Sequence, residues 1–185
     1  MTHTISLLVE NHHGALARIA GLFASRGYNI STLTVAETDD ASVSRMTIVV
    51  TGDEDVLEQV VKQLNKLIDV IKVIDFAGEP IVERELALIR VDATKSNRHE
   101  IFSLAEVCEA RIAAVEASSV TLQLAGESAS IDDLVALVKP YGIKELARSG
   151  AIAIARGAKS AGGAQGHAGG RPHQQTKPLT TSAHP

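Results

Sequence analysis

The chain of 185 residues contains no tryptophan, three phenylalanines, two tyrosines and one cysteine. With a single thiol, Cys108, the chain cannot form an internal disulfide. Cys108 shares one helical stripe with three apolar residues, Ile101, Leu104 and Ala105, which predicts a packing role instead of a reactive thiol. Only 3% of residues are aromatic but 45% are hydrophobic, so the sequence predicts a folded protein with an aliphatic core.

Long apolar segments are also missing. No run approaches the roughly 20 residues that span a bilayer, and the first residues lack the basic and apolar segments of a secretion signal. We therefore expect a cytoplasmic protein that does not contact a membrane. The net charge of −4 is a poor match for nucleic acid. A DNA-reading helix-turn-helix is not expected either, because a strand that begins at about Thr4 leaves no room for one.

Acidic residues are absent from residues 160–185, where Arg171 and Lys177 are the only fixed charges. Leu179 is the only large aliphatic side chain of this segment, so the segment cannot bury enough surface to offset the entropy of ordering. The sequence predicts a disordered tail. Its histidines have spacings that fit no compact metal-ligand set.

The first half of the chain alternates between the strand period of two and the helical period of 3.6. Asp39 and Asp40 mark a hairpin turn, Gly27 is typical of a helix C-cap, and a capping-box spacing at residues 51–54 predicts a helix start. The expected elements are a strand at 3–10, a helix from about 15, strands at 28–38 and 43–51, a helix over 56–67 and a strand at 70–76. This is the order βαββαβ.

The same order returns after Gly78. Ser96 is expected to cap one helix, and Ser130 opens a second capping-box spacing. The expected elements are a strand at 83–93, a helix at 97–109, a hairpin of 111–117 and 120–125, a helix from about 130 that Pro140 stops, and a last strand over 143–155. Two tandem ferredoxin-like domains of the α+β class are therefore predicted.

The predicted boundaries are a first domain at 1–77, a linker at 78–81, a second domain at 82–159 and the tail at 160–185. Each half has only about 75 residues, a size at which the buried fraction of the surface is marginal. We therefore expect the halves to pack on each other or on another chain, and a dimer is the expected state.

A candidate anion site lies where the first strand runs into the first helix. Gly14 allows close approach of the backbone, and unpaired N–H groups converge there with the positive end of the helix dipole. Asn11 can bind an amine or a carboxylate but cannot act as an acid or base at neutral pH. The pattern favours sensing over catalysis. The corresponding loop of the second half, residues 94–99, has no glycine, so no second pocket of this kind is expected.

Ordered blocks along the chain resemble the regulatory (small) subunit of acetohydroxyacid synthase, also called acetolactate synthase, whose first half is an ACT domain. In the first half the matching blocks are residues 11–19, 26–30, 33–35, 44–50 and 58–67. In the second half they are residues 82–89, 122–126 and 147–150. The resemblance extends to about Lys159 and leaves only the tail uncovered.

The resemblance implies a non-catalytic subunit that activates a separate catalytic large subunit and confers feedback inhibition, usually by valine. That catalytic subunit depends on thiamine diphosphate, FAD and Mg²⁺, and it condenses pyruvate with pyruvate or 2-oxobutyrate on the route to valine, leucine and isoleucine. No cofactor is expected in the present chain. The resemblance also implies a homodimer through the ACT domains.

The family pattern places the effector between the ACT domains of two chains. The matching residues are Asn11, Gly14, Ala15 and Leu16 from one chain and Asn29 and Ile30 from the other. The pair His12 and His13 departs from the pattern, in which a proline or small residue is more usual near this point. The pair leaves the shape and pH response of the loop open.

Other functions remain open at this stage. The alternative within the same fold is a stand-alone ACT-type module that senses an amino acid and regulates another enzyme. An enzyme would have to draw on Glu10, His12 and His13, and a metal sensor on the two histidines. Valine and isoleucine differ by one methylene, so the identity of a branched-chain effector also stays open.

Overall fold

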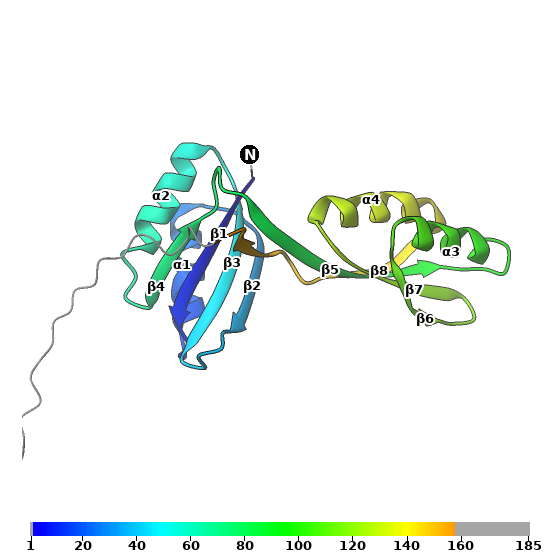
Figure 1. Ribbon diagram of the computed structural model, residues 1–185, viewed down its shortest axis with the longest axis horizontal. Helices are drawn as coiled ribbons and strands as arrows, with labels where there is room; N and C mark the ends of the chain where they lie inside the picture. Colours follow the sequence, from blue (N-terminus) through cyan, green and yellow to red (C-terminus); the bar gives the residue numbers. More distant parts are fainter. Residues whose placement is uncertain (1, 158–185) are drawn as a thin grey trace, which may run out of the picture.

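The computed structural model describes residues 2–157, in which two α+β lobes follow one another along the chain (Figure 1). The elements of the first lobe are β1 (Thr2–Glu10), α1 (Ala15–Arg26), β2 (Ile30–Glu37), β3 (Val43–Thr51), α2 (Glu54–Leu64) and β4 (Val70–Asp75). Its antiparallel sheet has the strand order β2-β3-β1-β4. The predicted order βαββαβ is confirmed.

The core of the first lobe lies between the two helices and one face of the sheet. Alternate residues of β1 face inward, as the period of two predicts, and the helical stripes of α1 and α2 cover them. The buried residues of this core are Ile5, Leu7, Val9, Ile19, Phe23, Met46, Ile48, Val50, Leu57, Val60 and Leu64. Within residues 2–157 no helix packs on the other face of the sheet (Figure 1).

The second lobe repeats this plan. Its elements are β5 (Ile81–Asp92), α3 (Arg98–Val107), β6 (Arg111–Val115), β7 (Ser119–Gly126), α4 (Ser128–Val138), the 3₁₀ turn η1 (Lys139–Tyr141), β8 (Ile143–Arg148) and β9 (Ile152–Ala155). The sheet order β6-β7-β5-β8 matches that of the first lobe, so the predicted duplication is confirmed. Cys108 ends α3 half-buried against this core, and burial raises the pKa of its thiol. The predicted packing role is confirmed.

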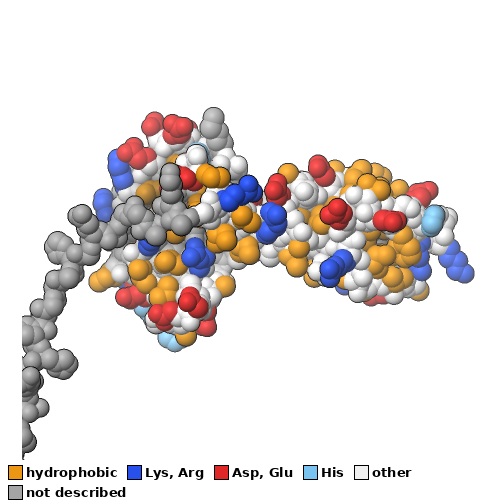
Figure 2. All heavy atoms as spheres, in the orientation of Figure 1, with side chains coloured by type: hydrophobic (Ala, Val, Ile, Leu, Met, Phe, Trp, Pro, Cys, Tyr) orange, Lys and Arg blue, Asp and Glu red, His pale blue; other side chains and the backbone are white. Residues whose placement is uncertain are grey.

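Strand β5 belongs to both lobes. Its second part pairs with β7 and β8 inside the second sheet, whereas Ile81 to Arg84 pair with Ile152 to Ala155 of β9. The resulting two-stranded ribbon reaches the first lobe and crosses the helix-free face of its sheet (Figure 1). Figure 2 shows the ribbon region as a narrower waist at which Lys and Arg side chains gather.

The prediction of one continuous last strand over 143–155 is wrong. The strand breaks at Ser149 and Gly150, because the chain must leave the second sheet and continue beside the start of β5. Gly150 has φ +78°, a left-handed conformation that glycine adopts without strain. Single glycines do not reveal such a break in sequence, since the apolar alternation continues on both sides of it.

Three predicted helix caps are also wrong. Helix α2 is capped by Asp53, whose side chain accepts from Val56 N, and not by the first residue of the 51–54 box. Helix α3 has Asn97 at its N-cap instead of Ser96. Helix α4 begins at Ser128, which leaves Ser130 inside the helix. In each case several polar residues compete for the cap, and the packing of the helix decides between them.

Strand β5 begins at Ile81, within the predicted linker 78–81, and the domain boundaries themselves remain a prediction. The tail predicted to be disordered, residues 160–185, lies outside the described residues. Within residues 2–157 no helix has both the length and the hydropathy needed to cross a membrane.

The corrected caps make a test. Ser130→Ala is expected to change the free energy of unfolding by no more than about 0.5 kcal/mol, because an exposed serine inside a helix gains nothing over alanine. Asp53→Ala, the matched variant of a working cap, is expected to cost about 1 kcal/mol. Urea unfolding followed by circular dichroism measures both. A loss at Ser130 as large as that at Asp53 would restore the capping-box assignment.

Candidate functional site

The loop between β1 and α1 turns on a left-handed glycine. Gly14 is the N-cap of α1 with φ 93° and ψ −13°, and a Cβ atom there would meet no other atom within 4 Å. The predicted need for glycine therefore comes from the backbone conformation, since the surrounding space is open. The amide of Ala15 makes a long hydrogen bond of 3.4 Å to His12 O, and the side chain of Ala15 is buried whereas that of Leu16 is exposed.

The N-terminus of α1 is open to an anion. No side chain caps it, and its first turn contains no acidic residue. Helix α2 of the same lobe differs, because Asp53 caps it and Glu54 and Asp55 occupy its first turn. The partial positive charge at the start of α1 is therefore not balanced from within the helix. A carboxylate is the kind of group that such an end attracts.

Asn11 lies next to this turn and supports the neighbouring hairpin. Its side-chain amide donates to Glu37 Oε1 at 3.0 Å and to the carbonyl of Ala41 at 2.9 Å, while its backbone N–H donates to Ser42 O at 2.7 Å. Both side-chain hydrogens are used locally, and the Oδ1 acceptor remains for an ammonium group. Asn11 thus ties the loop to the end of β2.

Asn29 and Ile30 lie at the opposite end of the sheet. Ile30 pairs with Val50, which also pairs with His3 near the start of β1, whereas Asn11 follows the far end of β1. Seven strand residues separate the two ends, a distance of about 23 Å. Within one chain the structure therefore brings Asn11, Gly14, Ala15 and Leu16 together but leaves Asn29 and Ile30 apart from them.

A cluster of ionisable side chains connects the loop to the neighbouring strands and to α1. His12 Nε2 lies 2.9 Å from Oδ1 of Asp69 and 3.5 Å from a carboxylate oxygen of Glu10. Arg18 Nη1, one turn into α1, lies 3.1 Å and 2.9 Å from the two oxygens of Asp69. The Asp69 side chain is only 3% exposed, and its carbonyl accepts from Glu10 N at 2.9 Å. Asp69 therefore fixes β1, the loop and α1 to one another.

The pKa of His12 is raised from its ordinary value of 6.5, and the hydrogen bond to His13 O is the largest cause. Nδ1 faces that carbonyl oxygen at 3.0 Å, and Nε2 faces a carboxylate. Only the imidazolium form can donate from both nitrogens, so these two acceptors favour the charged form. The nearby charges of Asp69 and Glu10 act in the same direction.

The same cluster contains the residues on which a metal sensor or a stand-alone enzyme would have to depend. Glu10, His12 and Asp69 bring three possible ligand atoms within 4.8 Å of one another, and His13 is not part of the group. Arg18 already neutralises Asp69, and a guanidinium about 3 Å from that carboxylate repels a metal cation. His12 hydrogen-bonds to His13 O and to Asp69, whose carboxylate is buried and also bound by Arg18. The arrangement joins the loop to its neighbouring elements.

The corresponding loop of the second lobe is closed by its own side chains. Arg98 donates to the carbonyls of Glu116 at 2.6 Å and Ala117 at 2.9 Å, and Asn97 accepts from Thr94 N at 2.7 Å. The guanidinium therefore caps the adjacent hairpin and is not presented to an anion. This geometry agrees with the expectation of no second pocket of the same kind.

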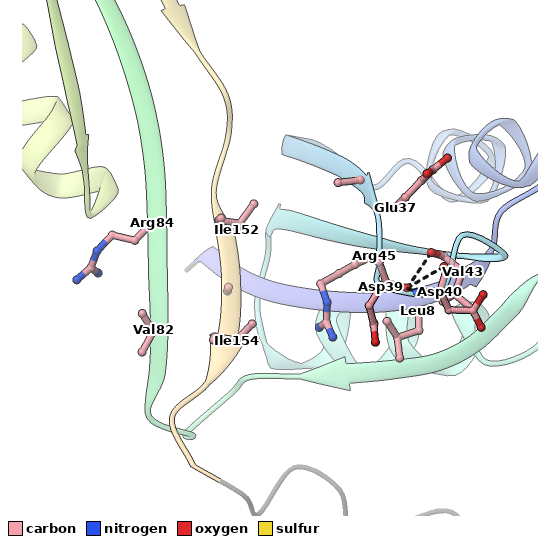
Figure 3. Close-up of a pocket in the computed structure, with 13 residues that line it drawn as sticks. Leu8, Glu37, Asp39, Asp40, Val43, Arg45, Val82, Arg84, Ile152 and Ile154 are labelled. Carbon is pink, nitrogen blue, oxygen red and sulfur yellow. Dashed lines mark hydrogen bonds between the residues drawn. The ribbon is translucent and has the colours of Figure 1, made fainter.

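An apolar groove of about 680 Å³ lies elsewhere, between the helix-free face of the first sheet and the ribbon (Figure 3). Leu8 and Val43 line one side, Ile152 and Ile154 the other, and Arg45 lies between them, bonded to Ser6 Oγ at 3.1 Å. The Gly14 loop contributes nothing to this groove. A binding site that is completed by a second chain does not have to form a pocket within a single chain.

Sequence reasoning missed Asp69 and Arg18. Asp69 lies 57 residues after His12, in the turn between α2 and β4, and no motif spacing connects the two. Arg18 has the helical spacing to reach back to the loop, but its partner is identified only when β4 is placed beside β1. The unusual His12 was the one signal, and its buried partner is a tertiary feature.

Comparisons with known proteins identify the family of the chain. Residues 5–72 match the family model described as AHAS small subunit-like ACT domain, and residues 84–157 match the small subunit of acetolactate synthase. The chain belongs to the acetolactate synthase small-subunit family. The predicted family is thus confirmed, and its members are regulatory subunits of that enzyme.

Individual relatives cover nearly the same length. The acetolactate synthase small subunit of Bacillus subtilis is 50% identical over 159 residues, which are 85% of this chain and 92% of the relative. That of Mycolicibacterium smegmatis is 42% identical, covering 89% and 96% of the two chains. The crystal structure of the small subunit from Thermotoga maritima aligns with a TM-score of 0.78 at 36% identity, covering 85% of this chain and 99% of that one.

The His12 cluster predicts a pH-dependent stability. Because the folded-state pKa of His12 is raised, its contribution is complete below pH 6.5 and is lost as the pH rises through the folded pKa. We expect the urea midpoint of the wild type to exceed that of His12→Gln most clearly near pH 5.5 and less toward about pH 8.5. Circular dichroism at a series of pH values measures the difference.

His13→Gln is the matched control, since it removes a neighbouring imidazole but leaves the His13 carbonyl in place. Its midpoint should follow that of the wild type across the series. A His12→Gln deficit that is the same at every pH would show that the His12–Asp69 contact does not depend on the charge of the imidazole.

Proposed function

We propose that this chain binds and activates the catalytic large subunit of acetolactate synthase and makes it sensitive to valine or a related branched-chain amino acid. The observation that carries the proposal is the open N-terminus of α1 at the left-handed Gly14, in a chain of the small-subunit family. Thiamine diphosphate, FAD and Mg²⁺ would belong to the catalytic subunit, and the present chain would supply regulation alone.

The chemistry of the Gly14 turn suits an amino acid. The α-carboxylate would accept from the first amides of α1, and the α-ammonium would donate to Asn11 Oδ1. The exposed side chain of Leu16 offers an apolar surface to the aliphatic side chain. A feedback effector needs a Kd of roughly 10⁻⁵ to 10⁻³ M, about −7 to −4 kcal/mol, which a few charge-assisted hydrogen bonds can supply.

A homodimer through β2 would complete the site. Strand β2 lies at the edge of its sheet and pairs with β3 alone among the described strands. Antiparallel pairing of two copies about the midpoint of this eight-residue strand would set the partner's Ile30 opposite Glu37. Because Glu37 accepts from Asn11, that pairing would carry the partner's Asn29 and Ile30 to the Gly14 turn. The separation of the two half-sites within one chain supports this arrangement.

The first test is reconstitution. The purified chain is expected to form no acetolactate from pyruvate when all three cofactors are supplied, and to raise the rate of its cognate catalytic subunit several-fold. Isothermal titration with valine, leucine and isoleucine then identifies the effector. Turnover by this chain alone would refute a purely regulatory role, and valine binding without any effect on the catalytic subunit would favour a stand-alone sensing module.

The second test concerns Gly14. In the reconstituted enzyme, Gly14→Asp is expected to abolish valine inhibition while activation is largely kept. The added carboxylate would repel the effector carboxylate at the helix N-terminus, and the core beneath is untouched. An inhibition curve measures the effect.

Gly14→Ala is the matched control. At φ +93° alanine and aspartate meet the same backbone strain, of order 1 kcal/mol, but alanine adds no charge. We expect Gly14→Ala to keep inhibition with a weakened apparent affinity. Unchanged valine sensitivity in Gly14→Asp would remove this turn from the effector site, and equal loss in both variants would assign the effect to the backbone.

A further inference from the structure

The break between β8 and β9 lies directly against β2. The hydroxyl of Thr34, in the middle of β2, donates to the carbonyl of Ser149 at 3.1 Å. A Cβ atom on Gly150 would lie 2.8 Å from Thr34 Oγ1 and 3.4 Å from Thr32 Cβ. The first distance is shorter than real Cβ contacts, so a side chain at position 150 would require Thr34 to shift. We call this contact of Ser149 and Gly150 with β2 the joint.

On the side of the second lobe the joint is firmly held. Ser149 N donates to Leu86 O at 2.9 Å, and Leu86 N donates to Ser149 Oγ at 3.0 Å. The preceding residue, Arg148, binds both oxygens of Glu85 at 2.8 Å and 2.7 Å, and the Glu85 side chain is only 2% exposed. Hydrogen bonding to Arg148 lowers the pKa of Glu85. Ser149 therefore moves with the second sheet.

On the side of the first lobe the joint is less well satisfied. The register of β2 against β3 shifts between Ile30 and Thr32, so the start of β2 is not locked by a regular ladder. The hydroxyl of Thr32 is buried beside Gly150 and has no hydrogen-bond partner among the described residues. An unpaired buried hydroxyl favours any small rearrangement that would pair it. The joint is therefore less firmly held on the side of β2 than on the side of the second sheet.

Strand β2 also links this joint to the candidate effector site. Ile30 begins the strand, Thr32 and Thr34 contact the joint, and Glu37 at its end accepts from Asn11. The hydrogen bond from Thr34 to the carbonyl of Ser149 links a displacement of β2 to the position of Ser149. A second polar contact between the lobes runs from Thr4 Oγ1 of β1 to Glu83 Oε2 of β5 and is 3.3 Å long.

We propose that the joint transmits effector occupancy from the first lobe to the second, with Thr34 and Gly150 as its positioning residues. This inference rests on the proposed function, because it requires that an amino acid bind at the Gly14 turn and at Ile30. Binding at the start of β2 shifts the strand, and the Thr34 contact carries the shift to Ser149 and through it to the second sheet.

The test separates binding from response. Thr34→Val keeps the shape of the side chain but removes the hydrogen bond to Ser149, and Gly150→Ala forces the two segments apart. In the reconstituted holoenzyme we expect both variants to bind valine within about threefold of the wild-type Kd by calorimetry. Residual activity at saturating valine should be at least twofold higher than in the wild type.

Two matched controls accompany these variants. Thr34→Ser keeps the hydroxyl and should restore the wild-type inhibition plateau. Gly142→Ala meets comparable backbone strain, at φ +95°, within the second lobe and away from β2, so it should leave the plateau unchanged. Hydrogen exchange adds a direct readout. Valine should change the exchange of amides in residues 143–157 in the wild type and not in Thr34→Val.

Each outcome decides the proposal. Full inhibition in Thr34→Val and Gly150→Ala at unchanged Kd would overturn it, as would wild-type exchange in residues 143–157 that does not respond to valine. A tenfold weaker Kd with an unchanged plateau would assign Thr34 to binding and overturn it as well. A wild type that neither binds valine nor responds to it would refute the proposed function and this inference together.

Discussion

A four-stranded sheet with helices on one side has a second face, which must either be covered by another segment or remain exposed to solvent. This constraint organises the whole chain. In the first lobe the ribbon of β5 and β9 crosses that face, and the polar side chains of Ser6 and Thr47 are buried there. In the second lobe the same face exposes Leu86 and Leu88. The two lobes share one topology but differ in what covers the helix-free face of the sheet, so they are not structurally equivalent.

The structural difference between the lobes is clearest in the loops that connect the first strand of each lobe to its first helix. In the first lobe the helix starts at a left-handed glycine without a side-chain cap, and Asp69 anchors the loop through hydrogen bonds with His12 and Arg18. In the second lobe Arg98 turns back onto backbone carbonyls and closes the loop. Duplication therefore preserved the scaffold, whereas the side chains around the two helix starts differ, so that one start is uncapped and the other loop is closed by Arg98.

The sequence predicts the elements of this chain well because hydrophobic periodicity is a local property, and both βαββαβ units are found where it places them. It does not predict the break at Gly150, because the apolar alternation continues on both sides of it. It does not predict the cap at Asp53 either, because packing decides between neighbouring polar residues. The candidate loop at Gly14 is visible in sequence, but its buried support, Asp69, is a tertiary contact. The assembly of Asn29 with the loop depends on a second chain and remains a prediction.

The same reasoning limits how selective the proposed site can be. One methylene in an apolar pocket is worth only about 1 to 3 kcal/mol, so charge recognition at Gly14 cannot by itself distinguish valine from its larger homologues. Discrimination must come from the apolar surroundings, and within one chain Leu16 is exposed while Ile30 lies at the far end of the sheet. If two chains build the pocket, dimer geometry sets its size. Selectivity and assembly would then be one property, and a change at the β2 edge would alter both.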